Sequence, residues 1–346
     1  MIDIEERLAH VLHDRAAGDV DAAALAAVAT ARGRRRLIRR RIGLAGAAAL
    51  TVLAVAAAVP SLVPGVGQGR GEYVAQIASA PEAPGAAARP DLVGTDPNVL
   101  HFAVDPEVGT PVLWASLAGR ETIQLMRDGR LVTVDMARDV VAFDKVLYDG
   151  VMAERPETWT DTTVDGRPAK VGTAANGRVV RWSPANGVWI DVSGYDETTD
   201  DLRAVAEGLW LDEALRCSVP FQLTTLPTGA RVSGCEVNAR GYPQSFSGSV
   251  LVSSSGGTMR IHAEYPPGLA GGKAANYQVA GRDAFLYPEH DELELLDEQA
   301  MYLTARAGDK LAGLDVDDAT LVLAGVRLAD PEDLASWPSP LVSPTP

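Results

Sequence analysis

The sequence is poor in cysteine and in aromatic residues. Its 346 residues include two cysteines, too few for a disulfide-dense scaffold or a four-cysteine zinc site. Aromatic residues make up only 5%, whereas 33 glycines and 22 prolines indicate more turns and linkers than a compact enzyme needs. The formal net charge of −15 excludes a chain that binds nucleic acid over its whole surface. A hydrophobic content of 47% excludes complete disorder, and at roughly 100–200 residues per domain the length allows one large or two modest domains.

Sequence motifs for catalysis are also missing. Neither a Gly-x-Ser-x-Gly elbow nor a Walker loop occurs, and His101, His262 and His290 are each isolated in the sequence. We therefore expect no catalytic, cofactor-binding or metal-binding residue, no cofactor and no enzymatic activity. An extracellular hydrolase, with a site assembled from distant residues, is kept as an alternative.

What the sequence does contain is a sharp division of charge. Directly after a block of arginines, positions 42–69 form a run of 28 residues without any charge. The block places seven arginines in ten positions: Arg32, Arg34, Arg35, Arg36, Arg39, Arg40 and Arg41.

The uncharged run predicts a transmembrane helix. Ile42–Val63 is 22 residues long with only Thr51 and Ser61 polar, and a helix needs about 20 apolar residues to cross a bilayer. Arginines that flank a span stay on the cytoplasmic side, so we expect a single-pass protein of the cell membrane with a cytoplasmic N-terminus and an extracytoplasmic C-terminus. Two alternatives are a buried alanine-rich helix and a cleaved signal peptide.

The first 41 residues predict a short helical tail. Ile4, Leu8, Val11 and Leu12 recur at the spacing of an amphipathic helix. Such a tail either associates with anionic lipid through its arginines or docks on a protein partner in the cytoplasm.

This layout resembles a group of uncharacterised single-pass membrane proteins from high-GC actinobacteria, some of which are linked to extracytoplasmic-function sigma factors. The composition agrees, with 27 arginines and only 4 lysines. The resemblance implies regulation of a partner such as a sigma factor. Zinc-type anti-sigma domains carry a His-x-x-x-Cys-x-x-Cys signature, however, and this tail has no cysteine.

An internal duplication is predicted after the span. VDGRPAKV at 164–171 matches VAGRDAFL at 279–286, which lies 115 positions later, and DLRAVAEGLWL at 201–211 matches DATLVLAGVRL at 318–328. The alternative is chance similarity between short Ala/Gly/Val segments. The resulting organisation is a cytoplasmic tail (1–41), a transmembrane helix (42–63), a Pro/Gly-rich linker (64–97), two external repeats (98–216 and 217–330) and a disordered tail (331–346).

Each repeat reads as an antiparallel meander closed by one helix, which predicts an α+β fold. Asn-Gly pairs at 176–177 and 186–187 mark hairpins. We expect Trp182, Trp189 and Trp210 to fill a core between helix and sheet, with ligand stacking as the alternative. The arrangement is similar to the curved-sheet modules of lipoprotein-carrier and sigma-regulator proteins.

The two cysteines, Cys217 and Cys235, fall at the junction between the predicted repeats. Outside the membrane we expect them to form a disulfide, and the alternative is a pair of buried free thiols.

The features above favour a membrane protein whose external domain binds or senses a ligand without catalysis. The alternative is a membrane-bound, anti-sigma-like regulator that holds a cytoplasmic partner through residues 1–41. The membrane is an expected partner under both hypotheses, and nucleic acid is not.

Overall fold

The structure is a computed structural model that describes residues 77–141, 156, 158–174, 177–255, 257–266, 273–288, 291–296, 301–307, 314–331 and 333–340. These residues belong to one unit of the chain, Arg70–Pro346. The predicted tail (1–41), the predicted span (42–63) and the seven arginines lie outside the described residues.

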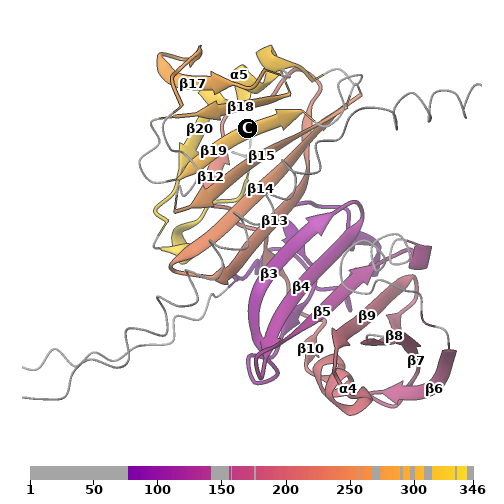
Figure 1. Ribbon diagram of the computed structural model, residues 1–346. Coiled ribbons are helices and arrows are strands. Elements are labelled where there is room, and N and C mark those ends of the chain that lie inside the picture. Colours follow the sequence, from indigo (N-terminus) through magenta and orange to yellow (C-terminus); the bar gives the residue numbers. More distant parts are fainter. Residues whose placement is uncertain are drawn as a thin grey trace, which may run out of the picture. The chain divides into compact units, whose positions relative to one another are not determined.

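Strands dominate the fold because β-branched and apolar residues alternate with polar ones over most of the described chain. Fourteen strands form one sheet in which every neighbouring pair is antiparallel. Figure 1 labels most of them. Their bounds are β3 (Thr110–Leu117), β4 (Arg120–Arg127), β5 (Arg130–Ala137), β6 (Thr158–Val164), β7 (Arg167–Ala174), β8 (Gly177–Ala185), β9 (Val188–Tyr195), β13 (Arg231–Gly241), β14 (Ser245–Ser254), β15 (Gly257–Tyr265), β16 (Tyr277–Val279), β17 (Arg282–Leu286), β18 (Glu292–Leu295) and β19 (Tyr302–Ala307).

The strand order in this sheet is the same in two halves of the chain. The first half runs β3-β4-β5-β9-β8-β7-β6, the second runs β13-β14-β15-β19-β18-β17-β16, and β3 pairs with β13 where the halves meet. We call residues 103–210 the first half and residues 221–328 the second half. The repeated topology means that each strand of one half has a counterpart in the other.

The short elements follow the same repeat. In the first half, helix α4 (Thr199–Glu207) leads into β10 (Leu209–Trp210), which pairs with β2 (Ala103–Val104). In the second half, helix α5 (Val316–Ala324) leads into β20 (Val326–Leu328), which pairs with β12 (Phe221–Leu223). Outside this pattern lie β1 (Val99–Leu100), paired with β11 (Leu215–Arg216), and two short 3-10 helices, Pro90–Leu92 and Leu334–Ser336.

The two segments singled out by sequence similarity occupy corresponding turns. Asp165-Gly166 joins β6 to β7, and Ala280-Gly281 joins β16 to β17. All four residues have positive φ, at 49° and 71° in the first turn and at 50° and 81° in the second. A two-residue hairpin loop needs this backbone to match the twist of its strands, and glycine adopts it without strain.

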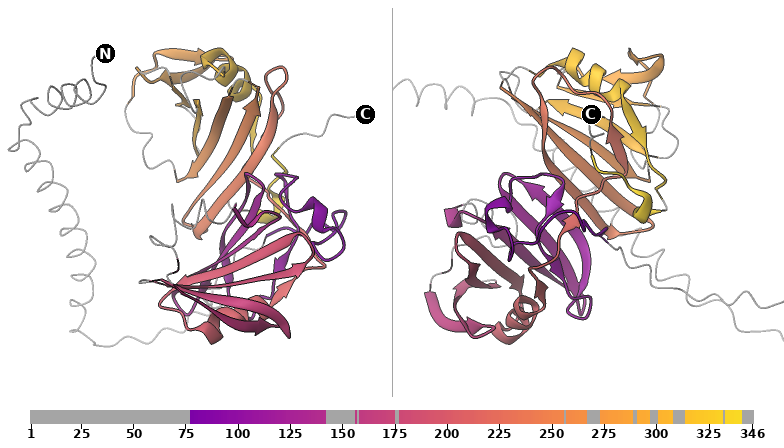
Figure 2. Two further views of the ribbon diagram at one scale, coloured as in Figure 1. Left: turned by 90° about the vertical axis from the view of Figure 1, so that its right-hand side faces the viewer. Right: turned by 180° about the vertical axis from the view of Figure 1, so that it is seen from behind.

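Both helices begin at a capping box. Thr198 and Asp315 are the N-caps, and the side chains of Asp201 and Asp318 bond back to the cap backbone. A cap of this type stabilises a helix by about 1 kcal/mol. Each helix buries one apolar face against strands of its own half, α4 against β6, β8 and β9 and α5 against β16, β18 and β19. Figure 2 shows the sheet and the helices from two further directions.

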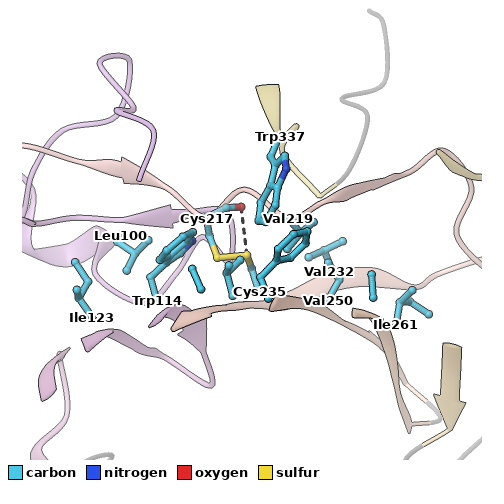
Figure 3. Close-up of a cluster of buried hydrophobic side chains, with 14 of the residues drawn as sticks. Leu100, Trp114, Ile123, Cys217, Val219, Val232, Cys235, Val250, Ile261 and Trp337 are labelled. Atoms are coloured by element: carbon cyan, nitrogen blue, oxygen red, sulfur yellow. Dashed lines mark hydrogen bonds between the residues drawn. A yellow bond between two sulfur atoms is a disulfide. The ribbon is translucent and has the colours of Figure 1, made fainter. Parts of the chain in front are cut away.

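A disulfide links Cys217 to Cys235 where the halves meet. Both residues are fully buried and their Cα atoms are 6.1 Å apart. Figure 3 shows Trp114 of the first half and Val250 of the second packed around it. The bond restrains the chain that enters the second half, which in the chain-entropy account stabilises the fold by roughly 3 kcal/mol.

The ends of the described region also pack into the fold. Ala80, Ala86 and Val93 are buried although the sequence predicts a linker over 64–97. Trp337 is buried in the predicted disordered tail, and Leu223 donates its backbone N–H to the carbonyl of Pro340. Pro/Gly-rich composition alone therefore does not separate a spacer from an irregular segment that packs.

The prediction of an α+β fold is wrong. The described residues form mostly antiparallel strand, and their two α-helices are nine residues long each. The prediction gave the closing helix of each repeat the weight of a structural layer, although one short helix covers only part of a seven-stranded half.

The prediction of a single-pass membrane protein is corrected as well. In the part of the chain that the structure describes, no helix is long and apolar enough to cross a membrane. The predicted localisation, with the N-terminus inside and the C-terminus outside, is therefore withdrawn.

Candidate ligand-binding site

A cavity of about 660 Å³ lies against the first half. Strands β6 to β9 form it, together with Val140 just after β5. Its lining residues are Val140, Trp159, Asp161, Pro168, Ala169, Lys170, Arg181, Trp182, Ser183 and Trp189. The volume falls within the range of pockets that bind small-molecule ligands.

The alternation of side chains along the strands places most of the lining on the face of the sheet opposite the core, whereas the lining residues Ala169 and Trp182 belong to the core. Ile190 and Val192 on β9 are fully buried in the hydrophobic core, to which α4 also contributes. Trp189 comes from the same strand one position earlier, so it points to the other face. We call this face the outer face.

Two tryptophans give the cavity its aromatic walls. Trp159 on β6 is 38% exposed and Trp189 on β9 is 36% exposed. Large exposed indoles next to a cavity offer broad, rigid contact area with one polar handle each. The arrangement suits stacking of a ligand or packing of an apolar side chain.

Arg181 is held in a fixed position beside Trp159. Its guanidinium carbon lies 5.2 Å from the centre of the indole ring. Nε and Nη2 each donate a hydrogen bond of 2.7 Å to the carboxylate of Asp191, which is fully buried. A bidentate pair of this kind fixes the plane of the guanidinium, so the cation is presented in one orientation.

A second buried carboxylate lies beside this pair on the neighbouring strand of the sheet. Asp135 on β5 lies directly opposite Asp191, and it accepts a hydrogen bond of 2.6 Å from the hydroxyl of Thr122. Its other partner is Arg120, whose Nε is 3.6 Å away. Burial raises the pKa of Asp135 because the charged form loses its hydration.

At the open side of the cavity, Lys170 donates a hydrogen bond of 2.8 Å to Asp161. Both side chains are well exposed, and the bond from Lys170 lowers the pKa of Asp161. Ser183 directs its hydroxyl toward the carbonyls of Ala185 and Val188. The polar groups of the lining are thus engaged with partners inside the protein.

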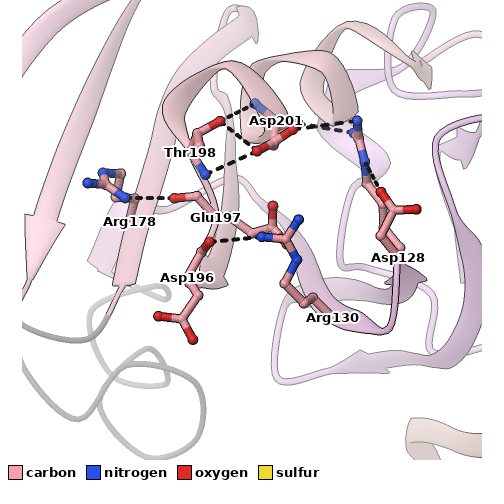
Figure 4. A network of polar contacts seen from close by, with 8 residues as sticks. Asp128, Arg130, Arg178, Asp196, Glu197, Thr198 and Asp201 are labelled. Atoms are coloured by element: carbon pink, nitrogen blue, oxygen red, sulfur yellow. Dashed lines mark hydrogen bonds and ion pairs between the residues drawn. The ribbon is translucent and has the colours of Figure 1, made fainter.

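The turn between β9 and α4 is fixed by a polar network shown in Figure 4. Arg178 on β8 donates to the carbonyl of Glu197 at 2.7 Å, and Arg130 donates to the carbonyl of Asp196 at 2.9 Å. The fully buried carboxylate of Glu197 lies 3.2 Å from Nε of Arg130, and burial raises its pKa. These contacts hold α4 behind the two strands that supply Arg181 and Trp189.

The second half has a counterpart of every strand around the cavity, so its equivalent place can be identified from strand register. In the first half, Arg181 on β8 lies between Lys170 on β7 and Asp191 on β9. In the second half, Glu294 on β18 lies in the same way between Phe285 on β17 and Thr304 on β19. The correspondences are Lys170 with Phe285, Arg181 with Glu294, and Trp189 with Tyr302.

Side chains of the protein itself fill that equivalent place. Lys273 donates hydrogen bonds of 2.5 Å to both Glu294 and Tyr287. Its ammonium lies 4.7 Å from the ring centre of Tyr287, 5.7 Å from that of Phe285 and 6.0 Å from that of Tyr302. Glu294 is fully buried beneath this cluster. Among the residues that the structure describes, the first half is therefore open where the second half is closed by its own lysine.

Sequence reasoning missed this site and singled out other residues. Cys217 and Cys235, the pair singled out as a disulfide candidate, are disulfide-bonded at the junction of the halves. Among the described residues, no group of three or more His, Cys, Asp or Glu side chains is placed to hold a metal ion.

The tryptophans were assigned to the core without regard to the alternation of their strands. Trp182 is buried, as expected, but Trp189 and Trp210 are 36% and 39% exposed. The signal for Trp189 was present in Val188-Trp189-Ile190, because a residue between two core aliphatics on a strand faces away from the core.

Comparison with known proteins gives no family for this chain. No family model and no curated protein matches it. Among solved structures, MucB in complex with MucA(peri) is 12% identical, with 64% of this chain and 93% of that chain covered and a TM-score of 0.22. The MucA/MucB complex of Pseudomonas aeruginosa (11%, 64% and 93%, 0.22) and MucB alone (13%, 71% and 100%, 0.19) are similar to the same degree. At these TM-scores the likeness assigns neither a family nor a function.

Proposed function

We propose that this chain is a binding protein whose ligand occupies the cavity between Trp159, Trp189 and Arg181. The observation that carries the proposal is the contrast between equivalent places in the two halves. One is closed by Lys273 and three aromatic rings, whereas the other has a cavity of about 660 Å³ with two exposed tryptophans.

The state of the polar groups supports binding without catalysis. Arg181 is paired with Asp191, Lys170 with Asp161, and the hydroxyl of Ser183 with backbone carbonyls. A nucleophile needs a neighbouring general base, and the described lining residues do not provide that pair. These groups orient a bound molecule instead. Specific turnover of an ester, peptide or glycan would contradict this part of the proposal.

The binding site is tested with 8-anilinonaphthalene-1-sulfonate, an aromatic anion that matches both the indoles and the two cations. We expect saturable binding at one site, with affinity reduced by up to about tenfold in Trp159→Ala and Trp189→Ala, since an aromatic contact contributes about 0.5–1.5 kcal/mol.

Tyr195→Ala is the matched control. Tyr195 is 41% exposed and lies on the same strand as Trp189, but it does not line the cavity. Equal affinity in all four proteins would place the dye elsewhere and would remove the support for the site.

Regulation of a partner such as a sigma factor stays a prediction, because it depends on residues 1–41 and these lie outside the described residues. Recovery of one specific protein with the full chain, and its loss when Ile4, Leu8 and Val11 are changed to serine, would support it.

A further inference from the structure

Strand β6 ends the large sheet on the side of the cavity. It pairs with β7 along its whole length, from Thr158 opposite Thr173 to Val164 opposite Arg167. Within the described ranges, no strand pairs with its other edge. Five of its seven residues are exposed, including residues on both faces of the strand, and no described strand lies along this edge.

The hairpin register shows which backbone groups are free at this edge. In a two-residue hairpin the residues that flank the loop exchange both hydrogen bonds, and bonded and non-bonded pairs then alternate along the ladder. Val164, Thr162 and Thr160 therefore bond to β7, whereas the N–H and C=O groups of Thr163, Asp161 and Trp159 point away from it. Pro168 lies opposite Thr163, which agrees because a proline has no N–H to donate.

Apart from the charged side chain of Asp161, this edge lacks the features by which proteins prevent strand pairing. The sequence of β6 is TWTDTTV, with no proline, lysine or glycine, and its pairing with β7 has no bulge. The strand at the other end of the sheet, β16, has only three residues. The edge strand β6 is therefore more than twice as long as the edge strand β16 at the opposite end of the sheet. This length favours β6 as the edge at which another strand can pair.

The open edge and the cavity are parts of one surface. Trp159 and Asp161 both line the cavity, and both have outward-pointing backbone groups. A chain that pairs with Trp159, Asp161 and Thr163 would bring every second side chain onto the outer face, next to the two indoles.

We propose that β6 accepts an extended segment of a protein partner as an added strand, with one bulky apolar side chain of that segment in the cavity. The proposal rests on the cavity being a binding site. Main-chain hydrogen bonds to Trp159, Asp161 and Thr163 supply affinity, and the cavity supplies selectivity. A second copy of this chain fits less well, because full-length antiparallel pairing of β6 with itself sets Asp161 directly opposite Asp161 of the other copy.

The probe is a capped nonapeptide with threonine at alternate positions, a central phenylalanine and a lysine at each end. Amide hydrogen exchange is followed by NMR on the full chain. We expect the peptide to slow exchange by about tenfold or more at Trp159, Asp161 and Thr163, where strand addition protects free N–H groups, and to leave Thr160 and Thr162 unchanged.

Two controls separate strand addition from cavity binding. Two variants of the peptide carry N-methyl groups on alternate amides, each along a different edge of the extended peptide. An N-methylated edge cannot pair with β6, so we expect one variant to lose binding and the other to keep it. Thr163→Pro removes an outward N–H without breaking a bond to β7, and we expect about tenfold weaker peptide binding with unchanged binding of the anilinonaphthalene dye.

No protection at the three residues, equal binding of both methylated peptides, or full binding to Thr163→Pro would each overturn the proposal. If the peptide slows amide exchange on β6 while Trp189→Ala leaves the affinity for the dye unchanged, the result supports strand addition and contradicts the cavity as a binding site.

Discussion

The two halves of the large sheet have the same strand order but differ on the outer face. In the second half, a lysine reaches into the cluster of Phe285, Tyr287 and Tyr302 and pairs with a buried glutamate. In the first half, the corresponding strands carry Lys170, Arg181 and Trp189, and they leave a cavity. Side chains of the protein fill this surface in the second half, whereas the described residues of the first half leave a cavity at the corresponding place. This difference favours the first half as the region that binds a ligand.

The largest predicted effect tests whether the inner faces are equivalent, as the comparison requires. Trp182 and Leu295 occupy corresponding inner positions, opposite Ile190 and Leu303, and both are buried. We expect Trp182→Ala to lower the free energy of unfolding by about 4 kcal/mol and Leu295→Ala by about 3 kcal/mol, because each leaves a cavity in the core. Urea denaturation measures both, and a loss below about 1 kcal/mol in either half would break the equivalence.

The disulfide tests how far the halves depend on each other. Replacing Cys217 and Cys235 together by alanine removes the restraint at their junction, and we expect a loss of about 3 kcal/mol. Thermal unfolding followed by calorimetry checks this value and also shows whether one transition splits into two. A variant as stable as the parent protein would mean that the bond does not restrain the unfolded chain.

The two lysines of the outer faces sharpen the contrast directly. Lys273→Ala leaves the buried carboxylate of Glu294 without its ammonium, and we expect a loss of about 2 kcal/mol. Lys170→Ala removes only a bond to exposed Asp161, so stability should not change measurably. Equal losses in the two variants would show that both lysines are structural and would weaken the case for an open site in the first half.

The smallest predicted effects concern pH, since corresponding positions hold Asp135 in the first half and His262 in the second. Burial raises the pKa of Asp135 and lowers the pKa of His262, so the fold favours the neutral form of both. Asp135 therefore costs stability as pH rises from about 4 through its raised pKa, and His262 costs stability as pH falls from about 6.5 through its lowered pKa.

These signs predict opposite pH profiles for two variants. Relative to the parent protein, Asp135→Asn should gain stability as pH rises above about 4, and His262→Asn should gain stability as pH falls below about 6.5. Chemical denaturation across that range measures the differences. Profiles that run parallel to the parent would show that neither group is perturbed by its site.

Local patterns in the sequence predicted local features of this fold. The matched segments at 164–171 and 279–286 contain the dipeptides that turn β6 into β7 and β16 into β17, because a positive-φ pair leaves a recognisable Xaa-Gly signature. The Asn-Gly pair at 186–187, which the sequence marked as a hairpin, likewise joins β8 to β9.

Features that depend on distant residues were not predictable in the same way. Nothing in the sequence indicates that β3 pairs with β13, since these strands are more than 100 residues apart. Lys273 lies before β16 and Glu294 lies on β18, and neither belongs to a motif, so their pairing could be recognised only from the fold. Trp189 is the exception, because its place between Val188 and Ile190 did indicate the outer face.

The proposed ligand site lies on the outer face of the first half, and fluorine NMR measures the location of binding directly. All six tryptophans, at positions 114, 159, 182, 189, 210 and 337, lie among the described residues and can be labelled as 5-fluorotryptophan and assigned by single Trp→Phe variants. On titration with the anilinonaphthalene dye, the resonances of Trp159 and Trp189 should shift together, while that of Trp114, which is buried and does not line the cavity, stays in place. Shifts confined to Trp210 or Trp337, with Trp159 and Trp189 unmoved, would contradict a binding site on the outer face of the first half.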